Sequence, residues 1–392
     1  MIYLDNNATT RTAPLAVTAM LPFFTTHYGN PSSAHGVGSE AAAALRQARR
    51  SVQALVGAAQ DHEIVFTSGG TEANATAIRS ALAVQPGRTE VVVSTVEHPS
   101  VLSMCDALER FEGIKVHRIA VDGEGRLDLD AYRAALSERV ALVSLMWANN
   151  ETGTVFPVDG LAELAHGVGA LFHSDAVQAA GKLPLRVSET SVDLLSLSAH
   201  KFHGPKGVGA LYVRKGTPFR SLLRGGKQER GRRAGTENLP GIVGAGVAAD
   251  LALAALAQTP RIAALRDRLE TGVLARIGGV TRLGDLGDRL PNTSALAFDL
   301  VQGEAIQARL NALGIAVSTG SACSSGAVEP SHVVRAMKIH FTVAHGVVRF
   351  SLSAETTEAE IARVIEVLPG ILADLRGPAP VAAPAREAAH AG

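Results

Sequence analysis

Short apolar segments alternate with longer segments of helical period over the first two-thirds of the chain. The short segments are rich in Val, Leu and Ile and mostly apolar on both faces, as is typical of strands that helices cover on both sides. The predicted strands are residues 63–67, 91–95, 115–120, 141–147, 171–176, 194–199 and 209–214. The predicted helices are residues 39–56, 71–84, 99–111, 128–137, 159–168 and 241–257. This alternation predicts an α/β domain with a mainly parallel, seven-stranded sheet.

The last third of the chain has a less regular pattern. Its predicted helices are residues 260–277, 303–312 and 357–375, and its predicted strands lie near 293–299, 315–318 and 347–352. We therefore expect a large α/β domain over residues 13–257 and a smaller α+β domain formed by residues 1–12 and 258–376. Residues 377–392 are rich in Pro and Ala and are expected to be a disordered tail.

Equal numbers of basic and acidic residues, 37 of each, give the 392-residue chain a formal net charge of zero. Charge therefore offers no argument for nucleic acid or an acidic membrane as a partner. The two cysteines, Cys105 and Cys323, cannot form a disulfide framework, and the N-terminus lacks the features of a signal peptide. The apolar segment 241–257 is interrupted by Asp250 and is expected to be a buried helix. Together these features predict a cytoplasmic protein.

Polar side chains follow the predicted strands, at the edge where open α/β sheets bind their ligands. The segment SGGTEANAT follows strand 63–67, and its two glycines lead into a helix near Thr71. Such a turn suits a phosphate group, because a helix N-terminus presents free N–H groups; the alternative is a tight turn with a threonine cap. His98 follows strand 91–95 and precedes a proline. It is either a general base or a ring-stacking lid, or else a surface residue at a helix start.

Two asparagines and an aspartate follow the next strands. Asn149 and Asn150 come after strand 141–147 and are either turn residues or hydrogen-bond partners of a ligand. Asp175 lies at the end of strand 171–176, so we expect its carboxylate to be partly buried and to need a partner. That partner is either an arginine or the cationic ring nitrogen of a ligand.

Lys201 directly follows the apolar strand 194–199. Desolvation in a pocket would lower the pKa of such a lysine and free its amine to bond a carbonyl carbon; the alternative is a solvated loop lysine. His200 and His203 flank it, but no third ligand with suitable spacing supports a metal site. The lysine, the aspartate, the Gly-rich turn and a stacking histidine are together the groups needed to hold pyridoxal phosphate.

At this point the chain resembles a known family, the cysteine desulfurases of the NifS/IscS type, which have the class V aminotransferase fold of pyridoxal-phosphate enzymes. The matching segments are YLDNNATT (3–10), YGNPSS (28–33), FTSGGTEAN (66–74), VEHPSVL (96–102), WANNETGT (147–154), HSDAVQAAGK (173–182), AHKFHGPKGVGALY (199–212), GGKQERGRRAGTEN (225–238), TGSACSSG (319–326), EPSHVVRAM (329–337) and VVRFSLS (347–353). They extend over residues 1–353, and the segments QERGRRAGTEN and YGNPSS are most similar to the nitrogenase-associated NifS branch. Ala199 is a mild departure, since relatives often carry glycine there.

The resemblance implies a role for each matching residue. Its cofactor-binding residues are Gly70, Thr71, His98, Asn149, Asp175, Gln178, Ser198, His200, Lys201 and Thr236. Among these, Lys201 bonds the cofactor aldehyde, Gln178 bonds the ring hydroxyl, and Thr236 reaches the phosphate of a neighbouring subunit, which implies a homodimer. Asn149 and Arg349 match substrate-binding positions, with Arg349 on the substrate carboxylate. Catalytic roles fall to Lys201, His98 and Cys323.

The implied reaction converts L-cysteine to L-alanine and leaves a persulfide on Cys323, whose sulfur passes to an iron–sulfur scaffold protein, with nitrogenase maturation the favoured pathway. Cys323 is also a candidate iron–sulfur ligand shared with that scaffold. It lies in the small, polar segment STGSACSSG, which we expect to be a mobile arm between pocket and surface, poorly ordered or far from Lys201 without an acceptor. Cys105 falls in a predicted helix and is expected to be structural. The alternatives are a general iron–sulfur or thiolation desulfurase, another class V aminotransferase or lyase, and a non-catalytic scaffold or regulatory protein.

Overall fold

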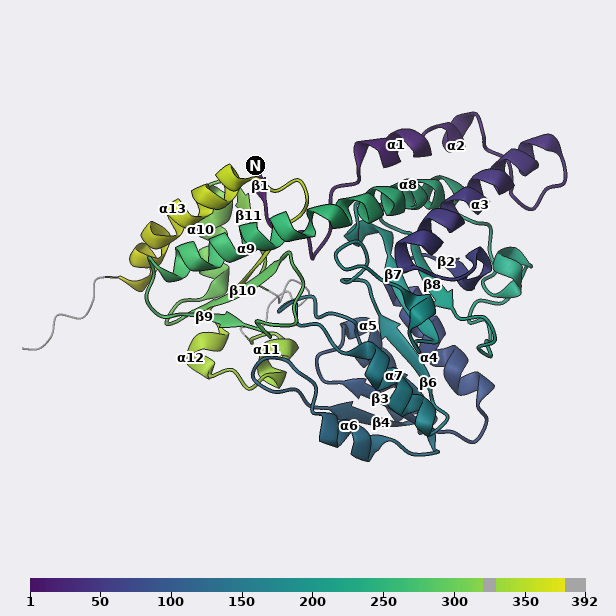
Figure 1. Ribbon diagram of the computed structural model, residues 1–392, viewed down its shortest axis with the longest axis horizontal. Helices are drawn as coiled ribbons and strands as arrows, with labels where there is room; N and C mark the ends of the chain where they lie inside the picture. The colour runs from purple at the N-terminus through teal and green to yellow at the C-terminus, as the bar shows by residue number, and fades with distance from the viewer. Residues whose placement is uncertain (320–328, 378–392) are drawn as a thin grey trace, which may run out of the picture.

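The central element of the computed structural model, which describes residues 1–319 and 329–377, is a seven-stranded sheet of order β2-β8-β7-β6-β5-β3-β4 (Figure 1). Its strands are β2 (Ile64–Thr67), β3 (Glu90–Ser94), β4 (Lys115–Ile119), β5 (Val140–Ser144), β6 (Leu171–Asp175), β7 (Leu194–Ser198) and β8 (Gly209–Val213). Each corresponds to a strand predicted from the apolar pattern. β8 runs antiparallel to β2 and β7, whereas the other neighbours are parallel, so the prediction of a mainly parallel sheet is confirmed.

Helices cover both faces of this sheet, which explains why its strands are apolar on both sides. The helices are α3 (Gly36–Val56), α4 (Gly70–Val84), α5 (Pro99–Glu112), α6 (Leu129–Ala135), α7 (Val158–Gly167) and α8 (Leu239–Ala255). Along β3, Val91 and Val93 pack in a cluster with residues of α4 and α5. Val92 lies between them and packs in the main cluster with α3, α7 and α8. Successive side chains of one strand therefore fill two different hydrophobic layers.

The last third of the chain forms a second group of strands and helices. β12 (Val347–Ser351), β10 (Thr293–Phe298) and β9 (Val280–Leu283) form an antiparallel sheet, and β1 (Ile2–Tyr3) pairs in parallel with β11 (Ile315–Ala316). α9 (Thr259–Leu274), α10 (Gly303–Ala312) and α13 (Glu358–Arg376) pack with these strands around a separate hydrophobic cluster that includes Leu4. The expected domain boundaries are consistent with this cluster and stay a prediction, while the expected tail after residue 377 lies outside the described residues.

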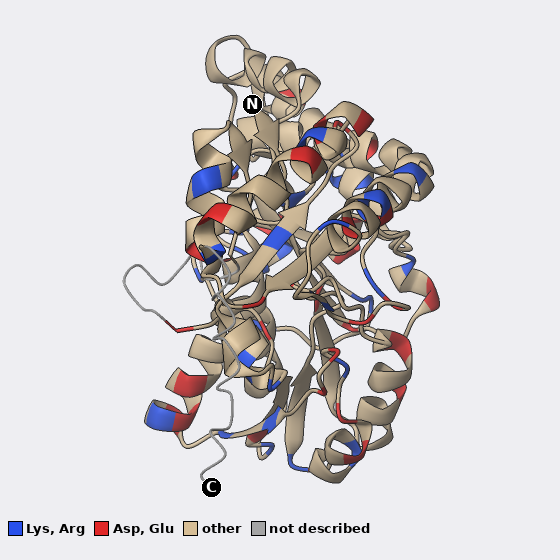
Figure 2. Ribbon diagram, turned by 90° about the vertical axis from the view of Figure 1, so that its left-hand side faces the viewer, with Lys and Arg blue, Asp and Glu red and all other residues tan. Residues whose placement is uncertain are grey.

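Several short elements were absent from the sequence prediction. They are α1 (Pro14–Met20), α2 (Pro22–Thr25), α11 (His332–Ala336), α12 (Phe341–Ala344), β1, β9 and the one-turn 3₁₀ helices η1 (Asp61–Glu63), η2 (Val187–Glu189), η3 (Ala199–Lys201), η4 (Gln228–Gly231) and η5 (Leu256–Gln258). Blue and red residues are interspersed along the helices in Figure 2, in line with the net charge of zero.

The apolar helix α8 is packed inside the protein. The helical stretch Leu239–Leu274 is long and apolar enough to cross a membrane, but half of its most apolar window is buried within the fold. α8 crosses α3 closely: a Cβ on Gly246 would lie 2.6 Å from the Cα of Ala48, so only glycine permits this approach. α8 is therefore a core helix, as expected for residues 241–257.

A buried ion pair attaches the loop 225–238 to the main core. Glu229 has a left-handed backbone (φ +48°), and its carboxylate accepts two hydrogen bonds of 2.6 Å from the guanidinium of Arg49 on α3. The backbone N–H of Phe66 donates to the same carboxylate at 2.9 Å. This arrangement satisfies a carboxylate that is almost fully buried.

Replacing Glu229 with Ala should lower the free energy of unfolding by about 3–5 kcal/mol, because it leaves the Arg49 charge buried without its partner. Denaturant titration measures the change. Glu366, whose ion pair with Arg363 is solvent-exposed, provides the control, and Glu366→Ala should change stability by less than about 0.5 kcal/mol. Equal effects of the two substitutions would contradict this account of loop anchoring.

Candidate active site

A cavity of about 560 Å³ lies at the carboxyl ends of the parallel strands. Segments that follow β2, β3, β5, β6 and β7 line it, together with the N-terminal segment 7–9 and residues Ser318 and Arg349. Of the residues proposed from the sequence, the cavity brings together Gly70, Thr71, His98, Asp175, Gln178, Ser198, His200, Lys201 and Arg349. These strand ends therefore share one cavity, while the ligand roles of the residues stay predictions.

Lys201 is held inside this cavity. It ends the 3₁₀ turn η3, directly after β7, and its Nζ donates hydrogen bonds to the carbonyl oxygens of Asn7 (2.6 Å) and Ala8 (2.8 Å). The N-terminal segment therefore fixes the amine at the cavity wall. The alternative of a solvated loop lysine does not describe this arrangement.

Asp175 ends β6 and is buried, with 6% of its surface exposed. Its Oδ2 accepts a hydrogen bond from Asn74 Nδ2 at 2.7 Å, and its Oδ1 accepts one from the backbone N–H of Val177 at 3.0 Å. Within the described ranges no lysine or arginine forms an ion pair with Asp175. The structure thus removes the arginine alternative and leaves a buried carboxylate, open to the cavity, that would be stabilised by a cationic group of a ligand.

His98 both caps a helix and lines the cavity. Its Nδ1 accepts a hydrogen bond from the backbone N–H of Ser100 (3.1 Å) and so caps α5, where Pro99 occupies the first turn. This contact leaves Nε2 as the protonated nitrogen of the neutral ring. Burial lowers the pKa of His98, Lys201 and His332 lower it further, and Asp175 opposes the shift. His98 is therefore favoured as an uncharged ring at the cavity.

The Gly-rich turn forms an open helix N-terminus at the cavity. α4 begins at Gly70, its N-cap is Gly69, and no side chain caps it, so the alternative of a threonine cap is wrong. A Cβ on Gly209 of β8 would lie 2.5 Å from the backbone of Gly69. The turn can pack this closely against the sheet only because Gly209 has no side chain. Ser198, His200 and Lys206 also line this part of the cavity. Uncapped N–H groups beside a lysine form a site suited to a phosphate.

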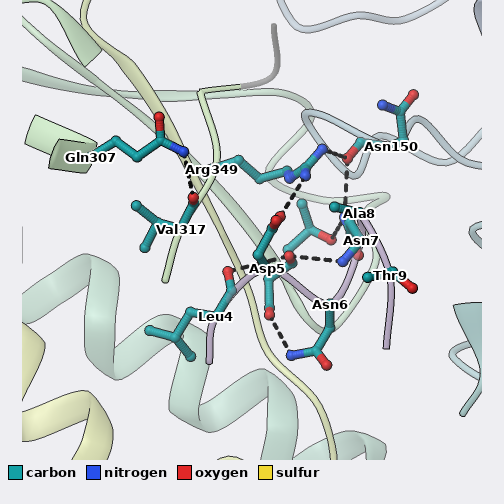
Figure 3. A network of polar contacts seen from close by, with 12 residues as sticks. Leu4, Asp5, Asn6, Asn7, Ala8, Thr9, Asn150, Gln307, Val317 and Arg349 are labelled. Carbon is teal, nitrogen blue, oxygen red and sulfur yellow. Dashed lines mark hydrogen bonds and ion pairs between the residues drawn. The ribbon is translucent and has the colours of Figure 1, made fainter. Parts of the chain in front are cut away.

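Arg349, on β12, lines the cavity and takes part in a network of polar contacts with Asp5 and Asn150 (Figure 3). Its Nη2 pairs with Asp5 Oδ1 at 2.8 Å, and its Nη1 donates to the carbonyl oxygen of Asn150 at 3.0 Å. Its Nε is buried and has no hydrogen-bond partner within the part of the chain that the structure describes. The guanidinium is thus held in place from two sides while one N–H remains unsatisfied.

The structure places two of the proposed residues outside the cavity lining. Asn149 is buried, and its Oδ1 accepts hydrogen bonds from the backbone N–H groups of Glu151 (2.9 Å) and Thr152 (3.0 Å), so it stabilises the turn. Its neighbour Asn150 lines the cavity, while the ligand-binding role expected of Asn149 stays a prediction. Thr236 lines a separate pocket next to Glu229.

Cys323, together with the expected mobility of its segment, lies outside the described residues. Ser318, which lines the cavity, precedes it by five positions in the sequence. Gln307 on α10 donates to the carbonyl oxygen of Val317 at 2.9 Å, and Ser331 donates to Glu151 at 2.6 Å (Figure 3 shows the first contact). Both described flanks of the segment are thus held by side-chain contacts.

Sequence reasoning missed the contribution of the N-terminal segment. Asn7 donates to the carbonyl oxygen of Asn150 and to Thr293, and it accepts from Lys182 and Asn292. The segment YLDNNATT was identified only as part of the resemblance. No local sequence pattern predicts that Asn150, Lys182, Asn292 and Thr293, which are distant from residue 7 in sequence, all contact the side chain of Asn7.

Comparison with known proteins adds to this geometry: the Aminotransferase class-V model matches residues 2–364. The chain belongs to this family. It is 66% identical to a cysteine desulfurase of Cereibacter sphaeroides, over 97% of this chain and 98% of the relative. It is 57% identical to cysteine desulfurase NifS of Azotobacter vinelandii, over 97% and 94% of the two chains. Within the class-V aminotransferases, the chain therefore belongs to the cysteine desulfurases, which are pyridoxal-phosphate enzymes.

Solved structures agree with this placement. A NifS-like protein superposes with a TM-score of 0.88 at 37% identity, covering 95% of this chain and 99% of the other. The protein SspA, determined in complex with cysteine, superposes with a TM-score of 0.79 at 30% identity, covering 91% and 100%. The predicted class V aminotransferase-like fold is confirmed.

The residues of the cavity fit the cofactor of this family. A pyridinium nitrogen would supply the cation that the buried Asp175 lacks among the described residues. The uncapped N-terminus of α4 suits the phosphate, and Lys201 places an amine on the same cavity. Burial and the positive charges of Lys201, Lys206 and Lys182 lower the pKa of His200 to about 4, so its ring is neutral near pH 7.

Proposed function

We propose that this chain removes sulfur from L-cysteine, releasing L-alanine and leaving the sulfur as a persulfide on Cys323. The observation that carries this proposal is the convergence of Lys201, Asp175 and Arg349 on one cavity. Ser318 also lines this cavity and precedes Cys323 by five positions in the sequence. The membership of the chain in the cysteine desulfurases supports the same reaction.

In this proposal the cofactor is held by groups that the cavity presents. Asp175 holds a proton on the ring nitrogen, the N–H groups of Gly70 and Thr71 with Ser198 and His200 receive the phosphate, and His98 covers the ring. When bound, pyridoxal phosphate supplies an electron sink for charge that develops at the substrate Cα. Lys201 anchors the cofactor before substrate arrives.

Arg349 orients the substrate by its carboxylate. Its guanidinium is fixed by Asp5 and by the carbonyl of Asn150, so little side-chain freedom is lost on binding. The guanidinium lines the cavity, where its positive charge is the group that attracts a carboxylate. Asn149, which the resemblance assigns to the ligand, and Asn150, which lines the cavity, are the two asparagines at this position.

Lys201 and Cys323 perform the two chemical tasks assigned to the protein itself. The Lys201 amine takes a proton from the substrate Cα and returns protons as alanine forms. The Cys323 thiolate attacks the substrate sulfur, so that the substrate C–S bond breaks and an S–S bond forms. Cysteine and one enzyme thiol thus give alanine and one enzyme persulfide, with all atoms balanced.

The sulfur then passes to an acceptor, for which we propose an iron–sulfur scaffold protein, with nitrogenase maturation as the pathway. The 57% identity to NifS of Azotobacter vinelandii supports this choice. We further propose a cytoplasmic homodimer in which Thr236, outside the cavity of its own subunit, contacts the phosphate bound by the partner. The proposed sharing of an iron–sulfur ligand through Cys323 depends on the same scaffold complex.

Asp175→Asn should lower the rate of alanine formation by roughly 10²–10³-fold, because a neutral amide does not hold a proton on the ring nitrogen. Asparagine keeps the size of the side chain, so the fold should be retained. Single-turnover measurement of alanine formation tests the chemical step. Asp159, an exposed residue at the start of α7, provides the control as Asp159→Asn, and an Asp175→Asn rate near wild type would contradict the assigned role.

The function is tested by mixing the purified protein with pyridoxal phosphate, L-cysteine and a reductant, and by measuring alanine and sulfide. We expect the two products in equal amounts. Pyruvate in place of alanine would indicate a lyase of the same family. Absence of both alanine and sulfide, with the cofactor bound, would overturn the proposed reaction.

A further inference from the structure

Lys182 contacts the back of the proposed cofactor site without lining the cavity. It lies four residues after Gln178, and its Nζ donates to Gln178 Oε1 at 2.5 Å and to Asn7 Oδ1 at 3.0 Å. Its side chain lines a smaller cavity of about 60 Å³ behind the main one. Lys182 therefore touches a cofactor-facing residue rather than the cofactor.

This contact determines which way the amide of Gln178 points. A protonated lysine amine has three N–H donors and no lone pair that could accept a hydrogen bond. It can therefore bond only to the oxygen of the Gln178 amide and not to its nitrogen. The Nε2 of Gln178 then faces the opposite way and donates to the carbonyl oxygen of Asn7 at 2.9 Å. Because Gln178 lines the cavity and an amide nitrogen carries two hydrogens, its second N–H is available to a ligand there.

We infer that Lys182 is a positioning residue that holds the Gln178 amide with its N–H, and not its oxygen, toward the ring oxygen of the cofactor. The inference rests on the proposed placement of pyridoxal phosphate beside Gln178. Without Lys182, Gln178 Oε1 loses the donor that satisfies it, and Gln178 is 5% exposed, so little water can replace that donor. Only the hydrogen bond from Nε2 to the carbonyl oxygen of Asn7 then opposes rotation of the amide oxygen toward the cofactor.

The charge around Lys182 is consistent with a donor role. Burial lowers its pKa well below the ordinary value, and the positive charges of Lys201 and Arg349 lower it further. Asp5 faces this group of cations but is engaged by Arg349. A neutral lysine amine also carries a lone pair, but its two N–H groups still match the acceptors on Gln178 and Asn7. The carbonyl oxygen of Asn7, which accepts from Gln178 Nε2, keeps the same amide orientation in that charge state.

The test is a double-mutant cycle on the full chain, with the dissociation constant of pyridoxal phosphate and the absorbance maximum of the bound cofactor as readouts. Lys182→Met should weaken cofactor binding about 3- to 10-fold, and Gln178→Leu about 10-fold. The double variant should bind no more than about 2-fold more weakly than Gln178→Leu, because Lys182 acts through Gln178. Both single variants should shift the absorbance maximum in the same direction. Lys215→Met, at an exposed lysine, is the matched control and should change neither readout.

Full multiplication of the two single effects in the double variant would overturn the inference, because Lys182 would then act independently of Gln178. If Gln178→Leu alone leaves affinity and spectrum unchanged, the proposed cofactor contact fails while the desulfurase reaction stands. Should Lys182→Met not fold, Gln178→Glu decides the question. That variant presents only acceptors to the cavity and should bind the cofactor at least 10-fold more weakly, whereas unchanged affinity would overturn the donor orientation.

Discussion

The variant Lys201→Ala is expected to lose the covalently attached cofactor and to form alanine about 10⁴-fold more slowly than the wild type. Two effects combine, because the amine both anchors pyridoxal phosphate and moves protons at the substrate Cα. Of the other lysines described near Lys201, Lys206 lines the same cavity and is tested below as the control. Lys182 is engaged by Gln178 and Asn7 behind the cavity. Absorbance spectra of the purified variant and its mass after borohydride reduction measure the loss.

Lys206 provides the control for this experiment, because it lines the same cavity and carries the same charge. Lys206→Ala removes a cation near the proposed phosphate site but should leave the cofactor covalently attached after reduction. Cofactor mass remaining on Lys201→Ala would assign the anchor to another residue. Loss of covalent attachment in both variants would show that the total positive charge of the cavity, rather than the amine of Lys201, determines cofactor binding.

The main sheet was predictable because its strands are buried on both faces. Runs such as 91–95 (VVVST) and 141–147 (ALVSLMW) are mostly apolar on both faces, and helices of clear period separate them. The same method misses β1 and β9, since β1 has two residues and β9 (VTRL) has two polar, exposed residues at its centre. The antiparallel direction of β8 was also beyond prediction, because its apolar pattern is the same in either direction.

The site was predictable where one residue follows one strand. Asp175 is the last residue of β6 and Lys201 ends the single turn that follows β7, so the rule for strand ends finds them. Asn149 and Asn150 show the limit of that rule: the backbone turn decides which of two adjacent amides faces the cavity, and the sequence ANNETG does not. Lys182 was missed because its role depends on the spatial position of Asn7, which is distant in sequence.

Cys323→Ala is expected to keep the absorbance of the bound cofactor and to lower sulfide release from L-cysteine by about 10³-fold or more. The reason is that the substrate C–S bond breaks only when a thiolate accepts the sulfur, and loss of the nucleophile removes that acceptor. Cys105 cannot substitute, because it is fully buried on α5 and burial raises the pKa of its thiol to about 12. Almost no Cys105 thiolate is therefore present near pH 7.

Cys105→Ala is accordingly the matched control, since it removes the other thiol of the chain and should retain sulfide release. Methylene-blue detection of sulfide and chromatography of alanine follow the two variants side by side. Sulfide release that persists in Cys323→Ala and disappears in Cys105→Ala would identify Cys105 as the nucleophile. That result would contradict the assignment of Cys323 and the expectation that a buried thiol is unreactive. Release that persists in both variants would remove enzyme thiols from the mechanism, and the product sulfur would then leave without a persulfide on the protein.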